Sequence, residues 1–198
     1  MRRHAEVTRK TSETNVSIAL DIDGRGQVTV STGYPFFDHM LTLFGYHGYF
    51  DLDIEAQGDI EIDEHHLVED VGLVLGTAFA KALGMKGGIR RYASALVPMD
   101  EVLVACAIDI SSRPFFGIEV RNAPDFERRF AECFRDFFRS FCVNAGITLH
   151  LNVVSAGGWH HLLEAIFKAS AVVLDQATTI DTRRSEAPST KGQPGETG

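Results

Sequence analysis

The stretch His65-His66-Leu67-Val68-Glu69 has a second copy 95 positions later, His160-His161-Leu162-Leu163-Glu164. The chain has only eight histidines, so this repeated pattern holds half of them. On an α-helix of about 3.6 residues per turn, the first histidine and the glutamate of each copy share one face, whereas the second histidine points roughly 100° away. Each helix therefore offers a nitrogen and an oxygen to one metal ion, and a second imidazole to another site.

Imidazole combined with carboxylate is a ligand set typical of borderline or hard divalent ions such as Mn, Fe or Zn. Two such helices facing each other could form two metal sites, each of which takes one histidine from across the interface. A single His-His pair is also compatible with a solvated helix surface or a helix cap. Because the whole pattern is repeated, we favour metal binding.

The composition limits the class of protein. The chain has 198 residues, of which 44% are hydrophobic, with 14 phenylalanines to fill a core. A net charge of −8 argues against non-specific nucleic-acid binding. Residues 1–15 lack the apolar segment of a signal peptide, and no apolar run approaches the roughly 20 residues of a membrane span. Three cysteines without C-x-x-C spacing argue against a disulfide framework and favour the reducing cytoplasm.

The histidine repeat belongs to a wider duplication. Residues 13–25 align with residues 101–113, with Glu, Val, Ala, Asp, Ile and Arg matching in register. The sequence therefore predicts an α+β fold of two similar halves, each an antiparallel sheet packed by two helices. We expect the first half over residues 1–88, the second over 89–181, and a polar, mobile tail over 182–198 that carries a compact Ser-Thr-Lys-Gly cluster.

Hydrophobic periodicity predicts the individual elements. In the first half we expect strands at 16–22, 27–30 and 49–56, the second returning from the first through a turn at Asp23-Gly24, and helices at 34–45 and 64–83. In the second half we expect strands at 91–96, 102–110, 115–120 and 147–154, and helices at 126–143 and 160–177.

Seven motifs in this order resemble the imidazoleglycerol-phosphate dehydratase family: Arg9–Thr14, Phe37–Leu41, Asp63–Asp70, Gly88–Tyr92, Pro98–Glu101, His160–Lys168 and Ser189–Gly192. The resemblance covers nearly the whole chain. It implies a homo-oligomer of 24 subunits with active sites between subunits and two Mn²⁺ ions per site. The implied reaction is loss of water from D-erythro-imidazole glycerol phosphate to give imidazole acetol phosphate, in L-histidine biosynthesis.

The resemblance also implies roles for individual residues. The implied metal ligands are His39, His65, His66, Glu69, His160, His161 and Glu164. Glu13 matches the catalytic glutamate of the amino-terminal segment. The implied contacts to the substrate and its phosphate are Arg91, Arg113, Lys168, Ser189 and Lys191, with residues 39–47, including His39 and His47, lining the substrate pocket.

The chain departs from the family pattern at two places. Where the family commonly has Glu-His-Phe-Phe, this chain has Arg135-Asp136-Phe137-Phe138, so we expect Asp136 to take the place of a histidine ligand. Residues 156–159 read Ala-Gly-Gly-Trp where many members have Gly-x-Asn, which changes the local loop contacts but not the ligands.

Other interpretations of these residues stay open from the sequence. Lys168 could form an i,i+4 ion pair with Glu164, and His39 could be a core histidine. Asp100 and Glu101 could orient a ligand imidazole or simply begin a strand. His150 fits a contact to a metal ligand or to the substrate better than direct ligation. As a whole, the chain could be a carbon–oxygen lyase, a metal-stapled assembly protein without catalysis, or a dinuclear metallohydrolase. Basic residues far from the histidine motifs in sequence favour the lyase, because a staple needs no phosphate anchor.

Overall fold

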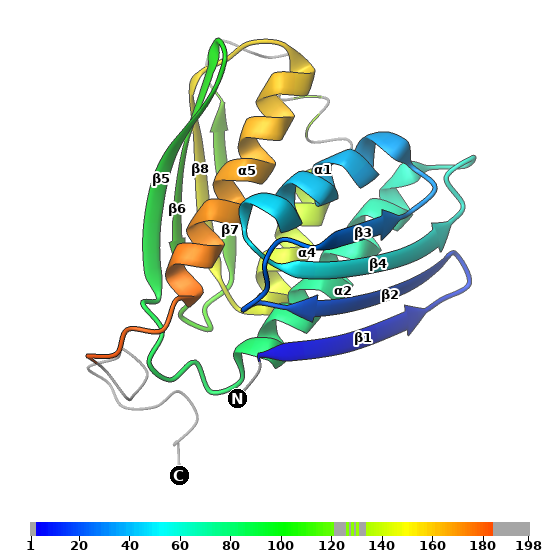
Figure 1. Ribbon diagram of the computed structural model, residues 1–198. Coiled ribbons are helices and arrows are strands. Elements are labelled where there is room, and N and C mark those ends of the chain that lie inside the picture. The colour runs from blue at the N-terminus through cyan, green and yellow to red at the C-terminus, as the bar shows by residue number, and fades with distance from the viewer. Residues whose placement is uncertain (1–2, 121–125, 127, 129, 131–133, 184–198) are drawn as a thin grey trace.

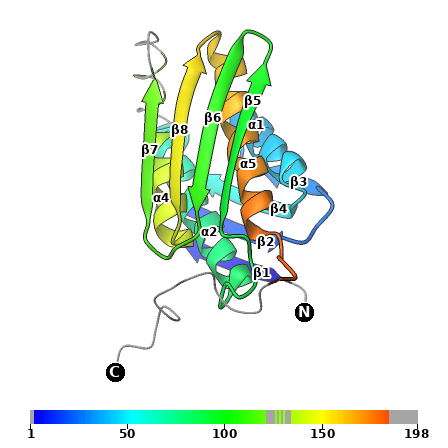
Figure 2. The ribbon, with the colours of Figure 1, turned by 90° about the vertical axis from the view of Figure 1, so that its left-hand side faces the viewer.

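The structure, a computed structural model, describes residues 3–120, 126, 128, 130 and 134–183. Two four-stranded sheets form the outer layers, and four helices lie between them (Figures 1 and 2). The first sheet contains β1 (His4–Lys10), β2 (Thr14–Asp21), β3 (Val28–Ser31) and β4 (Asp51–Gly58), covered by α1 (Pro35–His47) and α2 (Glu64–Leu83). The second contains β5 (Tyr92–Met99), β6 (Val102–Asp109), β7 (Phe115–Val120) and β8 (Thr148–Ser155), covered by α4 (Arg135–Ala145) and α5 (Trp159–Thr178).

The two sheets have the same topology, β1-β2-β4-β3 and β5-β6-β8-β7, which confirms the α+β fold of two similar halves. The expectation of purely antiparallel sheets is wrong for one strand in each half. β3 pairs in parallel with β4, and β7 pairs in parallel with β8. The reason is the connection: a helix joins β3 to β4, and a crossover of this kind brings the second strand back in the same direction.

Two further expectations need correction. The strand at 27–30 does not form a hairpin with β2, because β2 lies between β1 and β4. The single helix expected over 126–143 is interrupted, since Phe134 lies in a turn and α4 begins only at Arg135. The helix expected at 64–83 and the strand expected at 115–120 have the observed bounds.

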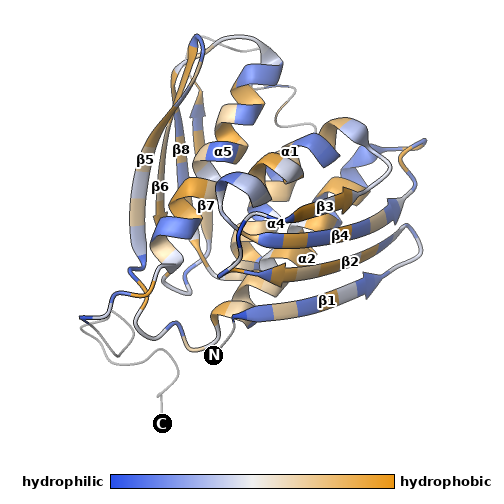
Figure 3. Ribbon diagram, viewed as in Figure 1, coloured by the Kyte–Doolittle hydropathy of each residue, from blue (hydrophilic) through white to orange (hydrophobic). Residues whose placement is uncertain are grey.

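Hydrophobic and polar residues alternate along the strands (Figure 3). One side chain in two is therefore buried on the side of the sheet that faces the helices. The space between the sheets is filled largely by phenylalanine rings. Among them Phe37, Phe137 and Phe167 are fully buried, and Phe137 contacts Phe37 edge-on and stacks on Phe167. A rigid aromatic core of this kind fixes the positions of the four helices that cross it.

Each helix of the first half is packed against a helix of the second half: α1 against α5, and α2 against α4. In α2 the close approach depends on glycine. A Cβ atom at Gly72 would lie 2.5 Å from the Phe137 carbonyl oxygen, and one at Gly76 would lie 2.5 Å from the Phe141 carbonyl oxygen. His65 and Glu69 lie on the same face of α2 as these glycines, so the packing brings them against the first turns of α4. In the part of the chain that the structure describes, no helix is both long enough and apolar enough to cross a membrane.

Candidate metal centre

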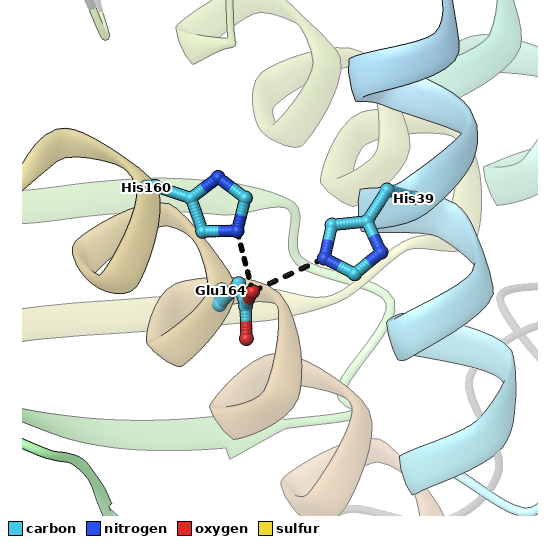
Figure 4. A group of neighbouring side chains, drawn as sticks. All are labelled: His39, His160 and Glu164. Carbon is cyan, nitrogen blue, oxygen red and sulfur yellow. Dashed lines mark hydrogen bonds and ion pairs between the residues drawn. The ribbon is translucent and has the colours of Figure 1, made fainter.

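The first copy of the site lies between α1 and α5. His39 on α1 and His160 on α5 both place Nε2 against the same oxygen of Glu164, at 3.1 and 2.7 Å from Oε1 (Figure 4). The two imidazole rings are stacked with their centroids 5.5 Å apart. One ligand atom from each of the three residues lies within 4.8 Å of those of the other two. Two nitrogens and one oxygen therefore converge on a single point at the helix surface.

Neighbouring side chains stabilise the negative charge of Glu164. Burial alone would raise the pKa of this carboxyl, which is 7% exposed, but hydrogen bonds from Lys168, His39 and His160 outweigh burial and hold the pKa at about 2. Lys168 Nζ lies 2.6 Å from Glu164 Oε2, so the i,i+4 pair considered from the sequence is present. His47, at the end of α1, has its pKa lowered by burial and by the charge of Lys168. The carboxylate therefore stays ionised and ready to bind a cation.

The second copy of the site lies between α2 and α4. His65 Nε2 is 3.5 Å from an oxygen of Glu69 and also 3.5 Å from an oxygen of Asp136. Ser140 donates to the other oxygen of Glu69 at 3.0 Å, and Arg139 lies 2.9 Å from Asp136. Asp136 thus occupies beside His65 and Glu69 the place that His39 occupies beside His160 and Glu164. This half-site has one nitrogen and two oxygens, whereas its counterpart has two nitrogens and one oxygen.

The second histidine of each motif points away from its own half-site. His66 Nδ1 lies 3.2 Å from both oxygens of Asp59, and His161 Nδ1 lies 3.1 Å from Glu101 Oε2. The hydrogen bond with Asp59 raises the pKa of His66, and the one with Glu101 raises the pKa of His161. A carboxylate that accepts a hydrogen bond from Nδ1 fixes the orientation of the ring and leaves the lone pair of Nε2 to bind a metal ion. This arrangement is typical of metal-binding histidines.

Glu101 also lies close to Asp100 and His161, and one ligand atom from each of these three side chains lies within 4.8 Å of those of the other two, so they too could hold a metal ion. Glu101 Oε1 accepts from the backbone N–H of Gly158, and this hydrogen bond, followed by others, lowers the pKa of Glu101 to about 2. The contact between Glu101 and His161 is consistent with Glu101 orienting that imidazole ring. The contact of Asp59 with His66 could not be predicted from the sequence, because Asp59 precedes α2 in a turn and has no matching residue in the second copy of the motif.

Glu13 lies in the turn between β1 and β2, exposed and near the start of α2. Its charge contributes to the raised pKa of His66, after that of Asp59. Thr11 Oγ accepts from the backbone N–H groups of Glu13 and Thr14, at 3.1 and 2.9 Å. Asp70, next to Glu69 on α2, accepts from both Arg9 and the Thr14 hydroxyl. The turn that carries Glu13 is therefore fastened to the helix that carries His65 and His66.

Arg91 and Arg113 meet at the other end of the molecule. Both guanidinium groups face Asp109: Arg91 Nε lies 2.6 Å from Oδ1, and Arg113 Nη2 lies 3.6 Å from Oδ2. Asp109 ends β6, whereas Glu101, beside His161, precedes its first residue. At about 3.3 Å per residue, the two groups are separated by roughly 25 Å along the strand. Arg91 and Arg113 therefore do not reach His161 of the same chain.

His150 lies on the outer face of the second sheet, with its ring centroid 5.0 Å from that of Phe115, so within one chain it faces away from both half-sites. Ser189 and Lys191 lie outside the described residues.

The donor sets fit a divalent metal ion. Imidazole nitrogens and carboxylate oxygens without any thiolate suit Mn, Fe or Zn. Each half-site supplies three such groups, which leaves coordination positions for a histidine from elsewhere and for a substrate.

We predict that Asp136 is a direct metal ligand. Asp136→Ala is expected to remove about one of two bound metal ions, because the α2/α4 half-site would keep only His65 and Glu69. Metal analysis after dialysis measures this loss, and Asp136→His should restore the ion while shifting the preference from Mn toward Zn. Asp53→Ala, an exposed aspartate on β4, is the control. Full metal content in Asp136→Ala would show that Asp136 is not a ligand.

Comparisons with known proteins identify the family. Residues 32–174 match the family profile of imidazoleglycerol-phosphate dehydratase. The imidazoleglycerol-phosphate dehydratase of Desulfosudis oleivorans is 51% identical over 193 residues, which are 97% of this chain and 99% of that protein. That of Citrifermentans bemidjiense is 50% identical over 197 residues, 98% of this chain and 100% of the relative.

Two crystal structures have the same fold. The imidazoleglycerol-phosphate dehydratase of Staphylococcus aureus superposes with a TM-score of 0.71 at 33% identity, covering 89% of this chain and 99% of that one. The enzyme of Pyrococcus furiosus superposes with a TM-score of 0.77 at 28% identity, covering 95% and 100%. The chain therefore belongs to the imidazoleglycerol-phosphate dehydratase family, the hydro-lyases of histidine biosynthesis.

Proposed function

We propose that the chain removes water from D-erythro-imidazole glycerol phosphate to give imidazole acetol phosphate, at an active site with two Mn²⁺ ions. The observation that carries this proposal is the pair of half-sites, His39–His160–Glu164 and His65–Glu69–Asp136, each beside a histidine turned outward. We assign His66 and His161 to metal ions held mainly by neighbouring subunits, because Asp59 and Glu101 orient their rings away from the half-sites of their own chain.

The hydrogen removed in this reaction is not acidic, because no carbonyl group adjoins its carbon. When bound, the metal ions supply Lewis-acid stabilisation of negative charge on the substrate's imidazole ring. The ring can then accept the electron pair that the departing proton leaves. Return of this pair would expel the hydroxyl group of the neighbouring carbon, which takes up a proton and leaves as water, and the enol that remains tautomerises to the ketone. We assign Glu13 as the carboxylate that takes the proton from carbon, since it is exposed beside His66.

Phosphate anchorage is assigned to Arg91, Arg113 and Lys168, together with Ser189 and Lys191 from the tail. Arginine offers paired donors to phosphate oxygens and lysine a point charge. Such a local basic site is needed for an anionic substrate in a chain of net charge −8. Because about 25 Å separates Arg91 and Arg113 from His161 of the same chain, we propose that they serve an active site whose metal ligands come from another subunit.

This sharing supports a homo-oligomer, and we propose the 24-subunit assembly implied by the resemblance. The division of the chain at residue 88 and the cytoplasmic location stay proposals as well. The choice of Mn²⁺ rests on oxygen-rich coordination at the α2/α4 half-site.

The function is tested by incubating Mn²⁺-loaded protein with imidazole glycerol phosphate. The ketone product should accumulate in step with substrate loss, and no inorganic phosphate should appear. Phosphate release without ketone would instead support the metallohydrolase. Neither product from fully loaded protein would support a non-catalytic assembly protein.

Metal binding and assembly are predicted to be coupled, because each metal ion is expected to join ligands from different subunits. Chelation should convert the large particle into a smaller species, and added Mn²⁺ should restore it. Light scattering on size-exclusion fractions measures the mass, with metal content determined in the same fractions. An unchanged large particle with demonstrably metal-free chains would contradict the coupling, though not the dehydratase activity.

A further inference from the structure

A third cation lies beside Arg91 and Arg113. Lys86, three residues beyond the end of α2, is half-buried, and its Nζ lies 3.0 Å from the hydroxyl oxygen of Ser112. Ser112 immediately precedes Arg113. Loops that follow α2 and β6 therefore bring three positively charged side chains to one place.

Within the part of the chain that the structure describes, Lys86 forms no ion pair with a carboxylate of its own. Asp109 is the nearby acid, and Arg91 already binds both of its oxygens, at 2.6 and 3.2 Å. Among the described residues, the Ser112 hydroxyl is the hydrogen-bond acceptor recorded for the ammonium group, which has three donors. Burial lowers the pKa of Lys86, and the positive charge of Arg91 lowers it further. A half-buried ammonium group beside other positive charges, with no carboxylate paired to it, is typical of a site that binds an anion.

The backbone supports the same conclusion. Five non-glycine residues of the described chain have a positive φ, and three of them lie here: Lys86 at 55°, Arg91 at 74° and Ser112 at 62°. Residues of this kind are held in unfavourable conformations and cluster at functional sites. The facing position is Gly146, also at positive φ, where a Cβ atom would lie 3.3 Å from Ser112 Cα and 3.5 Å from Lys86 Nζ. The absent side chain leaves room around the ammonium group.

We infer that Lys86 is a further phosphate-binding residue, which donates to a phosphate oxygen of the substrate beside Arg91 and Arg113 while Ser112 holds its ammonium group in place. This inference rests on the proposed function for the identity of the substrate. The excess of positive charge around Asp109 does not depend on the identity of the substrate. Inorganic phosphate is therefore a suitable probe of the site alone.

The test compares Lys86→Gln with Lys81→Gln, an exposed lysine in the last turn of α2. Loss of a charge-assisted hydrogen bond should raise the KM of Lys86→Gln by about 10- to 100-fold, with kcat changed little. Lys86→Arg should recover part of the affinity, and Lys81→Gln should behave as wild type. Metal content and melting temperature of each variant establish that it is folded and loaded.

Thermal stabilisation by inorganic phosphate separates this inference from the proposed function. Phosphate should raise the melting temperature of the wild type and of Lys81→Gln, but much less that of Lys86→Gln. This result supports the anion site even if the wild type forms no ketone. Equal stabilisation of Lys86→Gln and wild type, or an unchanged KM, would overturn the role of Lys86. A lower melting temperature with normal phosphate binding would equally overturn it, since Lys86 would then be only structural.

Discussion

Replacing Glu164 with glutamine is expected to remove the metal ion from the α1/α5 half-site and to lower turnover by more than about 100-fold. Mutation of residues that hydrogen-bond to a metal ligand typically lowers metal affinity or activity by about 10- to 100-fold. A larger effect is expected for Glu164, because its carboxylate is itself the oxygen ligand of the half-site. Both His39 and His160 contact the same carboxylate oxygen, so the neutral amide changes the charge and the hydrogen bonding of all three groups at once. Metal analysis and steady-state kinetics measure the two effects.

The stability of this variant needs a separate measurement, because Lys168 loses its ion-pair partner. Lys168 is largely buried, and breaking a buried pair from one side typically costs about 3–5 kcal/mol. Assays should therefore be made well below the melting temperature. Glu55→Gln, an exposed glutamate on β4, is the matched control and should retain full metal and activity. A folded Glu164→Gln protein with wild-type metal content would contradict the assignment of the site.

Replacing Glu13 with glutamine is expected to lower kcat by about 10²- to 10⁴-fold while metal content and assembly stay unchanged. The amide has nearly the same shape as the carboxylate but cannot take a proton. Glu13 is exposed, and its turn is held by Thr11, Thr14 and Asp70. The substitution should therefore leave the fold intact.

The kinetics of this variant are measured with Mn²⁺-saturated protein, again beside Glu55→Gln. A loss confined to kcat supports proton transfer, whereas an increase in KM alone would indicate a role in binding. Near wild-type kcat in Glu13→Gln would exclude Glu13 as the base.

The helices that carry the two histidine motifs could be predicted from the sequence because their signal is local. Three or four residues separate the ligands within each motif, and the helix bounds follow from Asp63, which caps α2, and from Gly84, which ends it. The place of Asp136 was predicted by resemblance, and its distance from His65 is consistent with that prediction. The close approach of α2 to α4 depends on Gly72 and Gly76. The sequence alone does not predict this role, because it depends on which helix packs against α2.

Other features depend on contacts between segments distant in sequence. The parallel pairing of β3 with β4 follows from the helix between them, although alternation alone gives no strand direction. β1 was missed because, of its inward-facing side chains, Ala5, Val7 and Arg9, only Ala5 is buried, which makes its hydrophobic pattern weak. Asp59 belongs to no motif, and only the fold brings it to His66.

The most direct measurement is a titration of metal-free protein with Mn²⁺, in which bound metal, particle mass and ketone formation from imidazole glycerol phosphate are followed on the same samples. Ketone formation should be absent without metal, and should reach its maximum when about two ions are bound per chain. Full activity in demonstrably metal-free protein, or no ketone from assembled protein with both half-sites filled, would contradict a metal-dependent dehydratase built on the two histidine motifs.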